Sequence, residues 1–319
     1  MRTDADAPVA QSLSRRQFLA VSMAVSAGVL RAADTQPADP IIDIHQHTHY
    51  MDRTDEQLVR HQQAMGVATT LLLPAGSPVR MPSTHDGKTN GLAAECEGVD
   101  SCIRLAVDHP GEYRFYANQV PDLPGARETL TGYLKAGGIG IGEQKFAVRC
   151  DSPPIEMVAE VAQQFDVPVL MHFQHETFNF HFENFHNILA KFPKVNFIGH
   201  AQTMWSYVDA KCDPAVMYPK GKITPGGITD RYLSDFRNFW VDTSAGSGLN
   251  FFNRDEDFAR GFLDRHQNRL LFGSDCPDHI GRGPTCLGWM IIRAIRRLSS
   301  SKSVERKLLY ENAKGLFRL

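Results

Sequence analysis

The feature that most constrains the fold is a regular alternation of short apolar runs with longer segments of helical periodicity. The apolar runs lie at residues 40–45, 68–73, 113–120, 139–146, 167–172, 195–200, 239–243 and 269–272. Helical patterns lie at residues 55–65, 154–165, 183–192, 256–266, 287–298 and 303–317. Strands that alternate with helices in this way imply a parallel sheet.

The number of these units indicates how the sheet is arranged. Eight strands with intervening helical segments suit a closed (β/α)₈ barrel, which needs about 250 residues. We therefore predict a single α/β domain, a (β/α)₈ TIM barrel, over residues 34–319. An open, doubly wound parallel sheet is the alternative, because it uses the same units. Two long segments, at 76–90 and 202–229, are rich in proline and glycine and are predicted to be loops; we expect the second to be an active-site loop or lid.

Residues 1–33 stand apart from this pattern and are predicted to be a twin-arginine signal peptide. Residues 14–19 read SRRQFL, and an uncharged apolar stretch follows to residue 30. That stretch is shorter than the about 20 apolar residues of a membrane span. We expect export by the twin-arginine route to the periplasm or another extracytoplasmic compartment. The mature chain then has no membrane span unless the leader is retained.

Composition narrows the range of partners. The chain has 319 residues, a net charge of −2 and six cysteines. This charge balance gives no basic patch of the kind that binds nucleic acid, so we expect a small-molecule substrate instead. None of the cysteines forms a C-x-x-C pair, which argues against a zinc ribbon. Cys96 and Cys102 are the nearest pair for a disulfide, and a homo-oligomer is compatible with the sequence.

Several predicted strands run into metal-binding side chains. The first ends in His45 and His47, the fifth in His172, the sixth in His200, and Asp275 follows the eighth. Active sites of such barrels are built at the carboxyl ends of the strands. Residues at i and i+2 share one face of a strand, so His45 and His47 can bind one ion together. We predict that His45, His47, His172 and Asp275 bind a divalent metal, in the first instance Zn²⁺.

The same residues resemble those of the amidohydrolase superfamily. The resemblance rests on HQH at 45–47, His172, His200, GSD at 273–275 and the closing segment ENAKGLF at 311–317. It is strongest to the amidohydrolase-related (amidohydrolase 2) family and covers nearly all of the chain after the leader. That family includes decarboxylases and lactonases. The resemblance therefore implies metal-dependent chemistry without naming a substrate.

The fourth predicted strand bears on the number of metal ions. Glu143 stands where superfamily members with two metals place a bridging carboxylate, and Lys145 shares its face of the strand. If Glu143 is a ligand, the resemblance implies a second ion held with His172 and His200. If Glu143 forms an ion pair or only supports the ligands, a single ion is expected.

The expected function is that of a metal-dependent hydrolase. A metal-activated water would attack the carbonyl group of a small amide, lactone or ester. Asp275 would act as general base and then acid, and His200 would orient or polarise the substrate. Two alternatives remain open, a metal-dependent decarboxylase on the same scaffold and a non-catalytic barrel that binds a metal or ligand.

Overall fold

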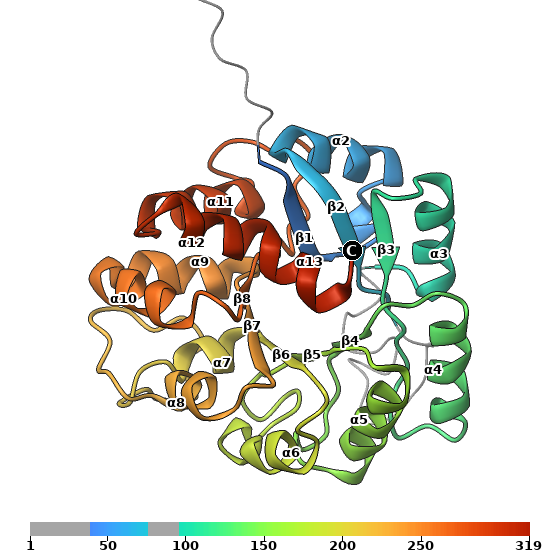
Figure 1. The fold of residues 1–319 in the computed structure, drawn as a ribbon, viewed down its shortest axis with the longest axis horizontal. Coiled ribbons are helices and arrows are strands. Elements are labelled where there is room, and N and C mark those ends of the chain that lie inside the picture. The colour runs from blue at the N-terminus through green and yellow to red at the C-terminus, as the bar shows by residue number, and fades with distance from the viewer. Residues whose placement is uncertain (1–38, 76–95) are drawn as a thin grey trace, which may run out of the picture. The chain divides into compact units, whose positions relative to one another are not determined.

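The described residues, 39–75 and 96–319 of a computed structural model, contain eight parallel strands that follow one another in chain order (Figure 1). The predicted leader and the predicted loop at 76–90 lie outside the described residues. The strands are β1 (Ile41–Gln46), β2 (Val67–Leu72), β3 (Tyr113–Phe115), β4 (Ile141–Gln144), β5 (Val169–His172), β6 (Phe197–His200), β7 (Phe239–Asp242) and β8 (Leu270–Leu271). Each strand within a sheet pairs in parallel with its neighbour.

Backbone hydrogen bonds join the two runs of strands, β1–β3 and β4–β8, into one barrel. The Ile44 amide donates to the Phe272 carbonyl at 3.1 Å, which connects β8 to β1. The Ile139 amide donates to the Phe115 carbonyl at 3.0 Å, which connects β3 to the start of β4. The prediction of a closed (β/α)₈ barrel is therefore confirmed. The open-sheet alternative is wrong, because the first and last strands are hydrogen-bonded to each other.

Helices surround the strands (Figure 1). They are α2 (Asp55–Met65), α3 (Val99–Asp108), α4 (Ala126–Lys135), α5 (Pro153–Phe165), α6 (His186–Lys191), α7 (Gln202–Ser206), α8 (Ile228–Asp235), α9 (Ala245–Arg254), α10 (Glu256–His266), α11 (Leu287–Leu298), α12 (Lys302–Arg306) and α13 (Asn312–Phe317). Short turns lie at Tyr50–Asp52 and Phe182–Asn184, and a π-helical turn at Lys307–Glu311 links α12 to α13. No described helix is both long and apolar enough to cross a bilayer.

Local sequence explains where helix α2 begins. Thr54 caps α2: its side chain accepts from the Gln57 amide, and the Gln57 side chain accepts from the Thr54 amide. This reciprocal capping box satisfies two amides that the helix itself leaves free.

Helix α9 was not predicted, because its sequence AGSGLNFFNR contains two glycines and few strong helix formers. Its buried Phe251 and Phe252, which lie against Trp205, stabilise it through packing instead.

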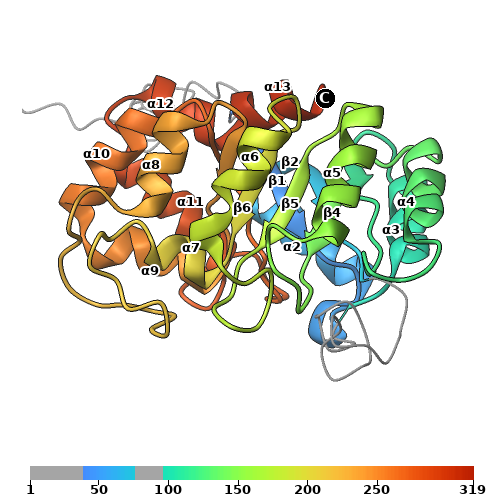
Figure 2. The same ribbon diagram turned by 90° about the horizontal axis from the view of Figure 1, so that it is seen from below.

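Apolar side chains fill the barrel and close one end of it. The interior cluster contains Ile42, Ile44, Leu71, Leu73, Tyr116, Leu170, Ile198 and Leu271, together with Ala313 and Phe317 of α13. Helix α13 thus covers the end of the barrel at which the strands start, as Figures 1 and 2 show. The polar strand-end residues gather at the opposite end.

Candidate active site

Six residues at the carboxyl ends of the strands form a group that we call the strand-end cluster. It consists of His45 and His47 at the end of β1, Glu143 on β4, His172 on β5, His200 on β6 and Asp275 after β8. His172 and His200 are register partners on adjacent strands, so their side chains lie at the same level of the barrel. The structure therefore brings together every residue that the sequence analysis proposed for the site.

An irregularity in β1 aims its histidines into the barrel. Ile44 belongs to the apolar interior, and strict alternation would turn the next residue, His45, to the outer side. The register between β1 and β2 shifts between Asp43 and Gln46, and such irregularities redirect side chains. Both Ile44 and His45 thus lie on the interior side, with His45 above the apolar layer. The alternation of residue types gave no sign of this shift.

Hydrogen bonds fix which nitrogen of three imidazoles carries the proton. His45 Nδ1 lies 2.7 Å from Asp242 Oδ2, and His47 Nδ1 lies 2.7 Å from the carbonyl oxygen of Leu73. His200 Nδ1 lies 3.0 Å from Ser244 Oγ, and the Ser244 hydroxyl group donates to Asp242 at 2.7 Å. Each Nδ1 therefore acts as the donor, which leaves Nε2 of each ring as the nitrogen that could bind a metal ion.

These Nε2 atoms face the two carboxylates of the strand-end cluster. Those of His45 and His47 lie 3.7 and 3.8 Å from Glu143 Oε2, and 3.8 and 3.4 Å from Asp275 Oδ1. His200 Nε2 lies 3.7 Å from Glu143 and 3.8 Å from Asp275. A tetrahedral ion with bonds of about 2.0–2.1 Å holds its ligand atoms about 3.3–3.4 Å apart, only slightly closer than these separations.

Unsatisfied polar atoms show that the residues fit a cation. The Nε2 atoms of His45 and His47 and Oδ1 of Asp275 are buried and have no hydrogen-bond partner among the described residues. Leaving such atoms unsatisfied is costly, and one cation between them would satisfy all three. Two overlapping groups, His45–His47–Asp275 and His45–Glu143–His200, have the compactness of a metal site. Their nitrogen and oxygen donors suit a divalent ion.

The electrostatics of the cluster point the same way. Burial opposes the charge of Asp275, but the nearby His45 and His47 hold the pKa of its carboxyl group well below the ordinary value. Burial alone would lower the pKa of His45, yet Asp275 and Asp242 raise it well above the usual range. The surplus of negative charge therefore favours a positive charge here, either a proton on His45 or a metal ion.

His172 lies slightly differently from the other histidines. Its Nδ1 is 2.5 Å from Glu143 Oε1, and its Nε2 is 3.2 Å from Gln174 Oε1. Burial and the nearby Lys145 lower the pKa of His172 to about 4, although Glu143 opposes this, so the ring is neutral near pH 7. In the described part of the chain, neither compact ligand group includes His172. Its predicted role as a metal ligand stays a prediction.

The structure also reveals residues that the sequence analysis did not assign. Asp242 ends β7 and accepts from His45; the strand-end criterion used for the histidines could have found it. Burial would raise the pKa of Asp242, but hydrogen bonds with His200 and His45 lower it to about 2, so it stays ionised. Tyr50 stacks edge-on against His47, with ring centroids 4.8 Å apart, and its hydroxyl group faces Asp275. Nothing in the sequence marked Tyr50, which lies in a short turn, as a residue of the site.

Two further residues that come after β6 in the chain, Trp205 and Arg231, do not belong to the strand-end cluster. Trp205 is buried and stacks on Phe251 with ring centroids 4.4 Å apart, so it is part of the core. Arg231 lies on α8 and lines a surface hollow with Glu183 and His186. No residue of the strand-end cluster lines that hollow.

The fold is an α/β barrel in which histidine and carboxylate side chains gather at the carboxyl ends of the strands. The profile of the family described as Amidohydrolase matches residues 42–319, and the chain belongs to this family. A search of curated protein sequences found no match.

Solved structures support the barrel. A TIM-barrel protein from Bordetella bronchiseptica is 12% identical, with a TM-score of 0.58, and the match covers 88% of this chain and 98% of that one. A protein assigned as a 2-pyrone-4,6-dicarboxylic acid hydrolase from Pseudomonas putida is 16% identical, with a TM-score of 0.56, covering 87% and 97%. A 2,6-dihydroxybenzoate decarboxylase from Rhizobium is 14% identical, with a TM-score of 0.55, covering 88% and 99%. At these identities the likeness concerns the fold.

Proposed function

We propose that the protein is a metal-dependent hydrolase that cleaves an amide, lactone or ester of a small molecule. The observation that carries this proposal is the set of buried, unsatisfied atoms, Nε2 of His45 and His47 and Oδ1 of Asp275, directed at one point. These residues would hold a divalent ion, in the first instance Zn²⁺. When bound, such an ion lowers the pKa of water and polarises a carbonyl oxygen.

The positions of Glu143 and His200 support a second metal ion next to the first. They form a compact group with His45, and the proton on His200 Nδ1 leaves its Nε2 lone pair directed at Glu143 and Asp275. We therefore propose His200 as a ligand rather than as a neutral donor to the substrate. His172, held by Glu143, would complete this second group or fix the orientation of the carboxylate.

Asp275 is the proposed general base. It is the most accessible member of the cluster, with 14% of its side chain exposed, whereas the histidines and Glu143 are buried. Because its pKa is depressed, the carboxylate is ionised near neutral pH and can take a proton from the attacking water. It would then return that proton to the leaving group.

Lys145 suggests what the substrate carries. Its ammonium group lies 5.5 Å from the centroid of the Phe178 ring, which in turn lies edge-on to His172 with centroids 5.8 Å apart. A half-buried cation beside the cluster favours a substrate with an anionic group, such as a carboxylate. This holds for hydrolysis and also for decarboxylation, the second candidate, because a decarboxylase requires a substrate carboxylate.

A substrate panel tests the proposal. Full-length protein loaded with Zn²⁺ would be assayed on carboxylate-bearing lactones, esters and amides and on aromatic carboxylic acids, with hydrolysis products and released CO₂ both measured. We expect hydrolysis, and a fall of about 10²- to 10⁴-fold in Asp275→Asn. Asp257→Asn, whose side chain is 91% exposed, is the matched control and should keep full activity.

The outcomes separate the candidates. Release of CO₂ without hydrolysis would favour the decarboxylase. If Asp275→Asn kept full activity on any substrate, the role given to this carboxylate would be wrong.

A further inference from the structure

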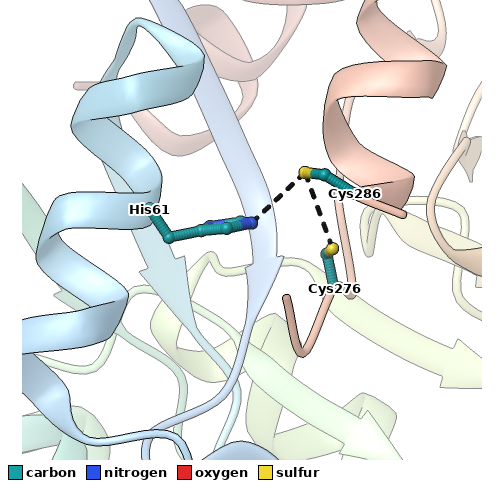
Figure 3. A group of neighbouring side chains, drawn as sticks. All are labelled: His61, Cys276 and Cys286. Carbon is teal, nitrogen blue, oxygen red and sulfur yellow. Dashed lines mark hydrogen bonds between the residues drawn. The ribbon is translucent and has the colours of Figure 1, made fainter. Parts of the chain in front are cut away.

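A second group of metal-binding side chains lies next to the strand-end cluster and shares none of its residues. Figure 3 shows His61 of α2 facing Cys276, in the loop after β8, and Cys286, which caps the start of α11. All three side chains are fully buried, and one ring nitrogen of His61 and the two sulfurs lie within 4.8 Å of one another. Met65, one helical turn after His61, brings a thioether to the same place.

The three separations from Cys286 Sγ to the other donor atoms match edges of a metal tetrahedron. Cys276 Sγ lies 3.8 Å from Cys286 Sγ, and Cys286 Sγ lies 3.4 Å from His61 Nε2 and 3.8 Å from Met65 Sδ. Metal–sulfur bonds of about 2.3 Å and metal–nitrogen bonds of about 2.0–2.1 Å give edges of about 3.8 Å between sulfurs and about 3.5 Å between sulfur and nitrogen. The agreement extends to all three separations.

The surroundings hold the two sulfurs in place. The Trp289 amide donates to Cys286 Sγ at 3.4 Å, and the Gly288 amide hydrogen-bonds to Cys276, so both sulfurs accept from the start of α11. A β-carbon at Gly288 would lie 2.6 Å from Met65 Sδ, so only glycine lets the thioether approach this closely. Two backbone amides thus fix the positions of the sulfurs, and the absence of a side chain at Gly288 leaves room for the thioether.

We propose that His61, Cys276 and Cys286, with Met65 as fourth ligand, bind a thiophilic metal ion, Zn²⁺ or Cu⁺, at a site separate from the candidate active site. Thiolate and thioether donors select such ions. Both cysteines bind as thiolates, and their two protons pass to the solvent. Since Cys276 follows Asp275 directly, the ion would anchor the loop that presents this carboxylate.

A disulfide is the competing outcome for the two cysteines. A sulfur–sulfur bond is about 2.03–2.05 Å long, so the separation of 3.8 Å is that of two unbonded sulfurs. A disulfide would also leave His61 and Met65 without a shared ligand. The six cysteines are all free in the described part of the chain.

Cobalt binding tests the site, because the strand-end cluster offers only nitrogen and oxygen. The reduced full-length protein would be stripped of metal and titrated with Co²⁺ while the thiolate-to-cobalt charge-transfer absorption is recorded. In His45→Asn/His47→Asn, where the strand-end cluster no longer competes for Co²⁺, we expect this band to saturate at one equivalent. In wild type it should reach the same intensity. It should disappear in Cys276→Ser and Cys286→Ser, and the Co²⁺ affinity should fall at least about 10-fold in His61→Ala. Elemental analysis of the protein as purified would distinguish Zn²⁺ from Cu⁺.

Cys102→Ser is the matched control, because Cys102 is equally buried but lies outside the group. Circular dichroism would confirm that each variant is folded. A folded wild type without the band, a band unchanged in both cysteine variants, or a Cys276–Cys286 disulfide in protein purified without reductant would each overturn the proposal.

Discussion

At the scale of single residues, the account of the site rests on the side chains that hold the proposed ligands as much as on the proposed ligands themselves. Asp242 accepts from His45 Nδ1 at 2.7 Å and from the Ser244 hydroxyl group, which in turn accepts from His200. One buried carboxylate thereby sets the protonation of two imidazoles. Outer partners of this kind affect metal affinity without touching the metal.

We therefore expect Asp242→Asn to weaken metal binding by about 10- to 100-fold, because the neutral amide holds His45 less firmly in its Nδ1-protonated form. Competition with a chromophoric chelator would measure the affinity. The exposed Asp257→Asn serves as control. Equal affinities in Asp242→Asn and wild type would show that Asp242 does not position the ligands.

Gly273 is required where three strand ends meet. A β-carbon there would lie 2.5 Å from Asp242 Oδ1 and 2.8 Å from the β-carbon of His45, and neither can retreat from its buried place. Gly273→Ala should cost about 1–3 kcal/mol of unfolding free energy and weaken metal binding. Gly315→Ala on α13 meets nothing within 4 Å and should instead stabilise the fold by up to about 1 kcal/mol. Urea unfolding of both variants checks this contrast, and an unaltered Gly273→Ala would contradict the account.

Strand ends can be recognised from apolar runs, and most of the residues that sequence reasoning proposed for the site lie close together in the structure. His45, His47, His200, Glu143 and Asp275 do converge. The details that depend on tertiary packing could not be predicted. Examples are the register shift in β1, the proton positions on the imidazoles, and the contact between two thiols ten positions apart and a histidine more than two hundred residues earlier.

At the scale of elements, sequence periodicity was reliable for amphipathic helices and weak for segments held by tertiary contacts. Helices α2, α10 and α11 have the predicted bounds. The third strand was predicted at 113–120 but is only Tyr113–Phe115, and the predicted helix at 183–192 is divided between a short turn and α6. The predicted loop at 202–229 contains α7 and the start of α8. Between these helices, Asp209 accepts hydrogen bonds from the Lys211 and Thr224 amides.

An ion pair links this segment to α9. Asp209 Oδ2 lies 2.6 Å from Arg254 Nη2, with the two side chains only 7% and 5% exposed. Removing one partner of a buried pair leaves the other charge unpaired, so Asp209→Asn should lower the unfolding free energy by about 3 kcal/mol. Glu160→Gln is the control, since Glu160 and Arg127 pair while 53% and 44% exposed, and its effect should stay below about 1 kcal/mol.

The effect of Asp209 should depend on pH. Burial raises the pKa of Asp209, but the Lys211 amide and Arg254 lower it by more than burial raises it. The folded pKa therefore lies below the unfolded value of about 3.9. The stabilisation is therefore present above about pH 4 and is lost as the pH falls through the folded pKa. Urea unfolding from pH 7 downward should show the difference between wild type and Asp209→Asn shrinking. A difference that is constant with pH would argue against this ion pair.

At the scale of the whole molecule, the apolar residues and the proposed metal-binding residues lie at opposite ends of the barrel. The end closed by α13 is apolar, and the opposite end gathers the strand-end cluster and the sulfur-rich group side by side through the consecutive residues Asp275 and Cys276. The loop after β8 is further fixed by the buried Arg53, which donates to the Cys276 carbonyl at 2.7 Å. This separation lets polar residues accumulate at one end without weakening the core.

The central claim is that the strand-end cluster holds a metal ion, and equilibrium dialysis against Zn²⁺ followed by elemental analysis tests it most directly. Wild type would be compared with a folded His45→Asn/His47→Asn variant, so that zinc bound at the sulfur-rich group cancels in the difference. The account predicts that wild type binds at least one equivalent more than the variant. Equal zinc content in the two folded proteins would contradict it.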